Sequence, residues 1–163
     1  MKHFLYSTAL ITALCAPGAA MADVILTVSG DVATPEQSNA WEFDLSALQA
    51  LPVTSIETTT IWTEGVQSFQ GVSLAALLEH VGAAQGTIQA VALNDYAVKI
   101  PTTDAVDDGP IVAYSLNGDE MSVRDRGPLW IIYPFDANET YKSEEYYSRS
   151  IWQLDRIEVV AQE

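Results

Sequence analysis

The sequence predicts an α+β domain built around a mixed β-sheet. Short segments in which every second residue is apolar recur along residues 24–160, and this is the period of a half-buried strand. Predicted strands outnumber predicted helices, and strands and helices do not alternate regularly. The 163 residues suffice for one ordinary domain and are too few for two. We therefore expect a single domain over residues 23–163.

The first 22 residues have the pattern of a secretory signal peptide. A basic start precedes the apolar run of residues 4–16, and Ala20-Met21-Ala22 supplies a cleavage site of the A-x-A type before Asp23. The apolar run is too short for a permanent membrane anchor. A lipoprotein would use Cys15, but Leu14 stands where a small residue is needed. We expect an exported chain that begins at Asp23 and does not insert into the membrane.

The exported chain is strongly acidic and has no cysteine. The leader contains Lys2, one of the seven basic residues, and none of the 22 acidic residues, which leaves 6 basic residues, 22 acidic residues and a formal charge of −16. Nucleic acids and anionic lipids are poor partners for such a surface. Cys15 lies in the leader, so the domain can hold neither a disulfide nor a thiolate metal site. Its fold must rest on the hydrophobic core.

The first half of the domain contains two predicted strands and two predicted helices. Apolar residues alternate over 24–30 and 41–45, which predicts strands. A short helix is expected over 46–51, before Pro52. The segment 73–82 has the spacing of an amphipathic helix, with Ser73 as its N-cap.

The second half is richer in strands. Residues 111–123 are predicted to form a hairpin, because Asn117-Gly118 is the strongest short hairpin signal. Asp104, Asp107 and Asp108 belong to a polar connection whose spacing matches no calcium-binding loop, and we interpret it as a solvated loop. The other elements are strands over 87–93, 96–100, 128–133 and 151–160 and an exposed, helical segment over 138–150.

No catalytic or metal-binding constellation is found in the sequence. The nucleophile, zinc-protease, P-loop and dinucleotide patterns are all missing. His80 is the only histidine after the leader and lies beside the apolar stripe of a predicted helix, where a surface position is the simplest interpretation. We therefore predict no catalytic residue and no metal ligand.

Three short motifs nevertheless carry a family resemblance. They are F-x-G-V-x-L from Phe69, L-N-D-Y from Leu93, and R-x-R-G-P-L-W from Arg124, and they follow the segment TTTIWTEG at residues 58–65. In this order they resemble the molybdopterin-binding domain of the sulfite oxidase family, especially its small secreted members, from about residue 24 to the C-terminus. The resemblance implies a mixed-sheet, three-layer α+β domain in which loops at strand ends form a pterin-binding cleft.

The sequence departs from the enzymes of this family at the metal ligand. In the enzymes a cysteine thiolate binds molybdenum from the region where this chain has Thr58, Thr59 and Thr60. Hydroxyl groups are poor ligands for this metal and do not ionise near neutral pH. Molybdopterin also carries a phosphate, and only Arg124 and Arg126 lie close together in the sequence to meet it. Molybdopterin is therefore a weaker candidate than a metal-free pterin.

A reduced pterin suits the residues of the three motifs. Aromatic rings such as those of Trp62, Trp130 or Tyr133 can stack on a flat pterin, and Asp95 can accept hydrogen bonds from its amino edge. Trp130 also suits a core position, Asn94-Asp95 also suits a simple turn, and local ion pairs also explain an arginine. In an extended segment Arg124 and Arg126 would point to the same side, which favours a shared task. The predicted ligand-binding residues are Thr60, Trp62, Thr63, Asn94, Asp95, Tyr96, Arg124, Arg126, Trp130 and Tyr133.

The resemblance also implies a role in signalling. The small cysteine-less relatives include periplasmic proteins that bind reduced pterins and signal to an inner-membrane enzyme that makes or degrades cyclic di-GMP. The leading hypothesis is thus a periplasmic, non-catalytic pterin-binding module with a membrane protein as its partner. The alternatives are a molybdenum-dependent oxidoreductase, or a subunit of one, and an electron-transfer or structural partner with an empty cleft.

Overall fold

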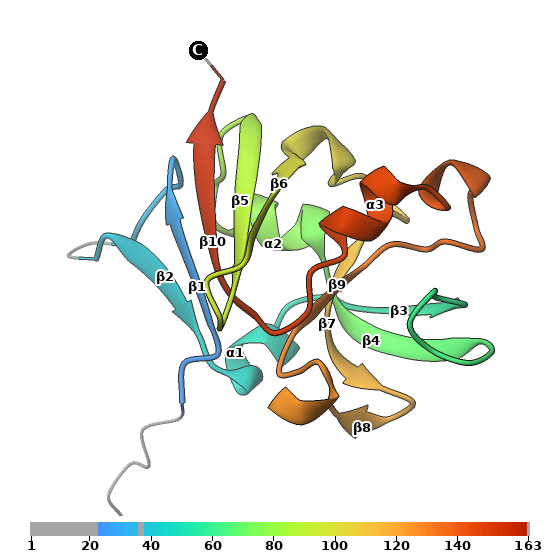
Figure 1. Cartoon of the computed structure of the whole chain (residues 1–163). Coiled ribbons are helices and arrows are strands. Elements are labelled where there is room, and N and C mark those ends of the chain that lie inside the picture. Colours follow the sequence, from blue (N-terminus) through green and yellow to red (C-terminus); the bar gives the residue numbers. More distant parts are fainter. Residues whose placement is uncertain (1–22, 36–37, 163) are drawn as a thin grey trace, which may run out of the picture.

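The computed structural model describes residues 23–35 and 38–162, so the predicted signal peptide lies outside the described residues. Two five-stranded sheets form the molecule (Figure 1). The first has the order β2-β1-β10-β5-β6, and the second has the order β3-β4-β7-β8 with β9 paired to β7. The first sheet consists of β1 (Leu26–Gly30), β2 (Ala40–Phe43), β5 (Gly86–Ala92), β6 (Ala97–Pro101) and β10 (Leu154–Ala161). The second consists of β3 (Val53–Thr58), β4 (Gln67–Ser73), β7 (Ile111–Leu116), β8 (Asp119–Glu120) and β9 (Trp130–Ile132).

The predicted α+β class with a mixed sheet is confirmed. In the first sheet β1 pairs with β10 in parallel, while β10 pairs antiparallel with β5. The helices are short and connect the strands. They are α1 (Leu45–Gln49), α2 (Leu74–His80) and α3 (Glu144–Arg149), with single 3-10 turns at η1 (Thr102–Asp104), η2 (Val123–Asp125) and η3 (Glu139–Tyr141). No helix in residues 23–35 and 38–162 is long and apolar enough to cross a membrane.

Helix α2 forms as its sequence predicts. The Ser73 hydroxyl oxygen accepts a hydrogen bond from the Ala76 backbone N–H at 3.0 Å, which satisfies one of the free donors at the helix start. The side chains of Leu74, Leu77 and Leu78 are buried on one face. The helix therefore contributes one apolar stripe to the core.

Two strands were not predicted, and one predicted strand is shorter than expected. β3 and β4 are rich in Thr, Ser, Glu and Gln. β3 is an edge strand, and only Ile56 and Thr58 on one of its faces are buried. The hairpin at Asn117-Gly118 does form, but β8 ends at Glu120 instead of continuing to residue 123. The chain then enters the 3-10 turn η2.

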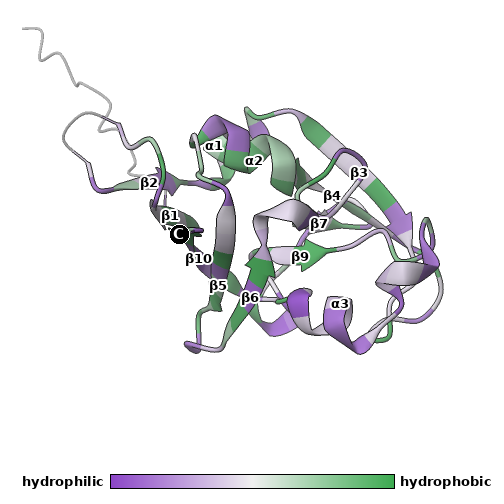
Figure 2. Ribbon diagram, turned by 90° about the horizontal axis from the view of Figure 1, so that it is seen from above, coloured by the Kyte–Doolittle hydropathy of each residue, from purple (hydrophilic) through white to green (hydrophobic). Residues whose placement is uncertain are grey.

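The hydrophobic core consists of two clusters of buried residues. The larger one contains Ile88 and Ile157 of the first sheet together with Val112 of the second, whereas the smaller one contains Phe69 and Trp130 of the second sheet. In Figure 2, β9 is largely hydrophobic while α3 is largely hydrophilic. The described elements thus bury the second sheet's central strands and leave α3 at the surface.

Gly71, the glycine of the F-x-G-V-x-L motif, lies where β4 packs closely against β7. A β-carbon at this position would lie 2.1 Å from the carbonyl oxygen of Val112, so only glycine lets β4 approach β7 this closely. Phe69 and Val72 of the same motif are fully buried. The F-x-G-V-x-L motif is therefore a packing signature.

Candidate functional site

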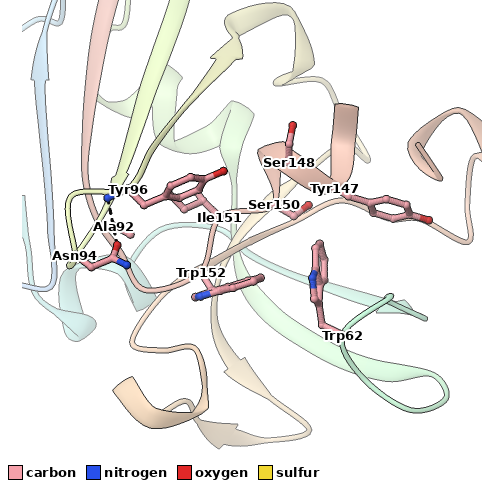
Figure 3. Close-up of a pocket in the computed structure, with 9 residues that line it drawn as sticks. All are labelled: Trp62, Ala92, Asn94, Tyr96, Tyr147, Ser148, Ser150, Ile151 and Trp152. Carbon is pink, nitrogen blue, oxygen red and sulfur yellow. Dashed lines mark hydrogen bonds between the residues drawn. The ribbon is translucent and has the colours of Figure 1, made fainter. Parts of the chain in front are cut away.

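A pocket of about 280 Å³ opens where the two sheets and α3 meet (Figure 3). The loop between β3 and β4 contributes Trp62, the end of β5 and the following turn contribute three residues, and α3 with the connection to β10 contributes the rest. We call it the aromatic pocket. Its lining residues are Trp62, Ala92, Asn94, Tyr96, Tyr147, Ser148, Ser150, Ile151 and Trp152.

Four of the nine lining residues of the pocket are aromatic. The ring of Trp62 lies 5.7 Å from that of Trp152 and 5.9 Å from that of Tyr147, and both pairs meet edge to face. In Figure 3 the rings of Trp62 and Trp152 stand on adjacent sides of the opening. Trp62 also contacts Trp130, which is fully buried behind it. Fixed rings around a cavity of this size favour a flat ligand.

The polar side chains that line the pocket are neutral. Two of them, both serines, can only accept a hydrogen bond from a ligand. The hydroxyl of Ser148 donates to the Glu145 carbonyl at 2.7 Å, and that of Ser150 donates to the Tyr146 carbonyl at 3.0 Å. Each hydroxyl has one hydrogen, so only lone pairs remain for a ligand. The Asn94 amide oxygen accepts the Tyr96 backbone N–H at 3.2 Å, which leaves its NH₂ group as a donor. No charged side chain lines the pocket among the described residues.

Arg126 supports the pocket from behind. Its guanidinium donates to the Trp62 carbonyl at 3.2 Å and lies 5.4 Å from the ring centre of Trp130 and 6.0 Å from that of Trp152. Its own carbonyl accepts the Gln153 backbone N–H at 2.9 Å. Arg126 therefore fixes the two tryptophans that line the pocket without lining it itself.

The expectation that Arg124 and Arg126 point to the same side of an extended segment is wrong. Residues 123–125 form the turn η2, and Arg126 follows in the left-handed region with φ 70°. The alternation of a strand does not apply in such a turn. Arg124 is exposed, whereas Arg126 is half-buried.

The threonine side chains of residues 58–63 form hydrogen bonds within the protein. The Thr59 backbone N–H and hydroxyl both donate to the Asp136 carboxylate, at 2.6 and 2.8 Å, and the Asp136 backbone N–H donates to the Thr58 hydroxyl at 3.0 Å. The Thr59 backbone N–H, then its hydroxyl and Lys142, lower the pKa of Asp136 below its usual value. The hydroxyls of Thr60 and Thr63 bond to each other at 2.8 Å. These contacts hold the Trp62 loop against the segment after β9.

Two other predicted ligand residues lie outside the pocket. Asp95 has φ 65°, is strongly exposed and forms an ion pair with Arg156. Tyr133 is fully buried, and its hydroxyl donates to Asp104 at 2.7 Å. Burial, followed by the bond to Asp104, raises the Tyr133 pKa far above its usual value, so its phenol stays neutral.

A buried ion pair holds α3 in place. Arg149 of α3 contacts the Asp104 carboxylate at 2.9 Å, and the two side chains are only 14% and 10% exposed. Arg149 also pairs with Glu145 and lies over the Tyr146 ring at 5.1 Å. Because α3 carries Tyr147 and Ser148, this ion pair positions one wall of the pocket.

The structure brings only part of the predicted site together. Trp62, Asn94 and Tyr96 line the aromatic pocket, and Thr60, Thr63, Arg126 and Trp130 adjoin those residues through the contacts described above or along the chain. Arg124, Asp95 and Tyr133 do not line it. Sequence reasoning missed Tyr147, Ser148, Ser150 and Trp152, although a tryptophan between Ile151 and Gln153, just before the last strand, was a usable signal.

Comparison with known proteins is consistent with this architecture. The model of the oxidoreductase molybdopterin-binding domain family matches residues 16–163. Among solved structures, the chain is similar to the crystal structure of the sulfane dehydrogenase SoxCD from Paracoccus pantotrophus, with a TM-score of 0.61 and 17% sequence identity. The similarity covers 84% of this chain but only 38% of that chain, and at this identity it shows the fold alone. No curated protein sequence matches. The chain belongs to the oxidoreductase molybdopterin-binding domain family.

Proposed function

We propose that this chain is a periplasmic, non-catalytic pterin-binding module. It binds a reduced pterin in the aromatic pocket and signals to an inner-membrane protein that makes or degrades cyclic di-GMP. The observation that carries the proposal is the lining of the pocket, which combines four aromatic residues with neutral polar groups and no charged side chain among the described residues.

The aromatic walls suit a flat bicyclic ring. Stacking of a heterocyclic base on an aromatic side chain contributes about 1–3 kcal/mol. Trp152 is 38% exposed and Tyr96 is 56% exposed, so both rings have surface available for a ligand. Trp62 is held from behind by Arg126 and Trp130, which reduces the entropy cost of ordering it on binding.

The polar groups favour the reduced form of the ring. A tetrahydropterin has N–H donors on its reduced ring in addition to those of its pyrimidine edge, whereas an oxidised pterin has ring acceptors at these positions. The hydroxyl oxygens of Ser148 and Ser150 are left as acceptors by their own hydrogen bonds. An N–H donor matches them, and a ring nitrogen with only a lone pair does not.

Molybdenum chemistry is the second candidate, and family membership is the observation that favours it. The side chains present do not supply the metal ligand and the phosphate-binding cation that the complete molybdenum cofactor would need. Cys15 is the only cysteine of the chain and lies outside the described residues, and residues 23–35 and 38–162 contain no group of three His, Cys, Asp or Glu side chains that could hold a metal. Within the described part of the chain, no cationic side chain lines the pocket to bind a phosphate. We therefore derive no reaction through this group.

The location and the partner rest on other grounds. The predicted leader supports export, and the resemblance of the three motifs to small secreted family members supports a role in signalling. The pocket lining that the structure describes contains neither a charged nucleophile nor an acid-base pair, which supports binding without turnover.

Identification of the bound molecule tests the proposal directly. The exported chain is purified without oxygen from its native compartment, its small-molecule content is measured by mass spectrometry and its metal content by elemental analysis. We expect a stoichiometric tetrahydropterin in the native chain and its loss from Trp152→Ala. Stoichiometric molybdenum, or a native chain that neither carries nor binds a tetrahydropterin, would contradict the proposal.

The signalling step is tested in cells. We expect that deletion of the gene and replacement of Trp152 by Ala change the cyclic di-GMP level in the same direction, because both remove the pterin-bound form. The matched control is Trp41→Ala, which removes a tryptophan from β2, away from the pocket. Cyclic di-GMP levels that do not respond to the deletion would refute the signalling step.

A further inference from the structure

Gln153 lies where the chain passes from the second sheet to the first. The residue before it, Trp152, forms a bridge with Trp130 of β9, and the residue after it, Leu154, pairs with Ala92 of β5. Trp152 and Ala92 line the aromatic pocket, whereas Gln153 is not one of its lining residues. Gln153 therefore joins two walls of the pocket without lining it itself.

The backbone of Gln153 is left-handed, with φ 52°. In a regular strand, residues two positions apart point to the same face. Here Trp152 lines the pocket while Leu154 is fully buried in the core, because the left-handed residue between them turns the chain. Residues other than glycine rarely adopt this conformation, and those that do gather at ligand sites. Asp95, between two lining residues, and Arg126, behind the tryptophans, are left-handed as well.

Three hydrogen bonds connect Gln153 to segments that are distant in sequence. Its backbone N–H donates to the Arg126 carbonyl at 2.9 Å, and its carbonyl accepts the Leu93 backbone N–H at 2.9 Å. Its side-chain Nε2 donates to the Val123 carbonyl at 2.7 Å. Val123 begins η2 and Arg126 follows it, whereas Leu93 begins the turn between β5 and β6. One residue thus holds η2 and this turn together.

The bond between the Gln153 carbonyl and Leu93 fixes the separation of two pocket walls. Asn94 and Tyr96, which follow Leu93, form one wall, and Trp152, which precedes Gln153, forms another (Figure 3). A shift of the Gln153 backbone would move the Trp152 ring relative to the Asn94 amide. A binding site keeps its affinity only while such groups stay within about 0.5 Å of the productive geometry.

We propose that Gln153 is a positioning residue of the aromatic pocket. Its left-handed backbone and its bond to Val123 hold Trp152 at a fixed distance from the turn of residues 94–96, and this distance sets the affinity for a flat bicyclic ligand. The inference rests on the proposed function, because a reduced pterin is the ligand. Its geometric part concerns the protein alone and is tested on the protein without ligand.

Replacement of Gln153 by Glu tests the side-chain bond. The substitution keeps the length of the side chain, but a carboxylate cannot donate to the Val123 carbonyl at pH 7. The rings of Trp62, Trp130 and Trp152 lie 5.7 to 6.1 Å apart, so near-UV circular dichroism of the ligand-free protein reports their arrangement. We expect a changed spectrum at pH 7 that returns toward that of wild type near about pH 4, where the new carboxyl group gains a proton and can donate again.

Anaerobic calorimetry with tetrahydrobiopterin measures the effect on affinity. The Val123 bond is exposed to solvent, so its loss in Gln153→Glu and in Gln153→Gly should weaken binding only about threefold at pH 7. Gln153→Val should weaken binding about tenfold or more, because a β-branched residue disfavours the left-handed backbone that glycine adopts freely. The matched control for the added charge is Gln162→Glu, at an exposed position after β10, which should behave as wild type.

Three results would overturn the proposal. The first is that Gln153→Glu and wild type have the same near-UV spectrum and the same affinity at pH 7. The second is an equal effect of Gln162→Glu, which would assign the change to charge. The third is a lower Tm in Gln153→Val with unchanged affinity, which marks a merely structural residue. A wild-type chain that does not bind tetrahydrobiopterin would contradict the proposed function, and circular dichroism would then still decide whether Gln153 positions Trp152.

Discussion

Trp62 lies where the two core clusters and the aromatic pocket meet. It is half-buried, packs against both clusters and forms one wall of the pocket. The contact between Arg126 and its carbonyl and the threonine contacts of its loop hold it in this position. A ligand that contacts Trp62 therefore contacts a side chain that packs against both core clusters.

Replacement of Trp152 by Ala should weaken binding of a tetrahydropterin. The ring is 38% exposed and forms a wall of the pocket, and loss of its stacking should cost about 1–3 kcal/mol, roughly a factor of 5 to 150 in affinity. Anaerobic calorimetry measures the change. The control is Trp41→Ala, whose ring packs with His80 away from the pocket. Equal affinities for wild type and Trp152→Ala would show that the ligand binds elsewhere.

Asp136 should contribute to stability only above its folded pKa. Its carboxylate accepts two hydrogen bonds from Thr59, which lower its pKa below the ordinary value of 3.8. A lowered folded pKa means that this contribution is complete above about pH 4 and is lost as the pH falls through the folded value. Asp136→Asn should therefore lower the free energy of unfolding by about 1 kcal/mol at pH 7.

Denaturant unfolding from pH 7 to pH 2 measures this effect. The difference between wild type and Asp136→Asn should shrink below pH 4, where the wild-type carboxylate becomes protonated. Asp107→Asn, in an exposed loop, is the matched control and should show a much smaller difference at any pH. A difference between wild type and Asp136→Asn that stays constant down to pH 2 would contradict the assigned cause.

At the scale of elements, α3 depends on contacts outside itself. A helix of six residues is too short to be stable alone in water. Its stability comes from the ion pair of Arg149 with Asp104 and from the packing of Tyr146 and Tyr147 onto the core. The wall that α3 gives to the pocket is therefore sensitive to a residue in η1 that does not touch the pocket.

Asp104→Asn should disturb binding through α3. Removal of one partner leaves the largely buried Arg149 with only its exposed partner Glu145, at a cost of about 3 kcal/mol in the free energy of unfolding. We expect the affinity for a tetrahydropterin to fall as well, because Tyr147 and Ser148 move with the helix. Glu145→Gln removes the exposed partner of Arg149 and should cost less than about 1 kcal/mol.

Stability and affinity are measured on the same samples by denaturant unfolding and calorimetry. A loss of stability in Asp104→Asn with unchanged affinity, measured where the variant is still folded, would show that the ion pair stabilises the fold without positioning the pocket. Faster hydrogen exchange confined to α3 would locate the effect.

Local sequence signals predicted the elements whose causes are local. The hydroxyl cap and leucine spacing of α2 and the Asn117-Gly118 turn lie within a few residues of the structure they determine. β3 and β4 could not be recognised in this way, because polar residues alternate with few apolar ones and their pairing with each other and with β7 decides their state.

In the candidate site too, residues placed by local structure could be predicted from the sequence, and residues placed by long-range pairing could not. Asn94 and Tyr96 belong to a turn that the sequence marks, and Trp62 belongs to a conspicuous loop. Trp152 and Ser150 reach the pocket because the segment before β10 lies along β9, with a bridge between Trp130 and Trp152 and a hydrogen bond from the Trp130 indole to the Ser150 carbonyl. This is a long-range arrangement that no local pattern encodes. Arg126 supports the pocket from outside its lining, because the turn η2 forms where an extended segment was expected.

At the scale of the whole molecule, net charge should make stability depend on salt. With a formal charge of −16 after the predicted leader, repulsion among the carboxylates opposes the compact state. Screening from about 0.01 M to 0.5 M sodium chloride reduces the Debye length from roughly 30 Å to less than 10 Å. A gain of about 1 kcal/mol then corresponds to a rise of about 3 °C in Tm. Calorimetric scans measure it, and a Tm that falls with salt would show that specific ion pairs outweigh the net charge.

The aromatic pocket connects parts of the molecule that are distant in sequence. Trp62 comes from the loop between β3 and β4 of the second sheet, Ala92 comes from β5 of the first, and Tyr147 comes from α3. A ligand that contacts all three should stabilise the folded chain as a unit, because separation of the sheets would destroy the site. At a free ligand concentration of 100 times Kd, the free energy of unfolding should rise by about 2.7 kcal/mol. Hydrogen exchange should slow in β4 and β5 together, whereas slowing confined to α3 and the turn after β5 would mean that the ligand closes a local flap and leaves the junction of the sheets unchanged.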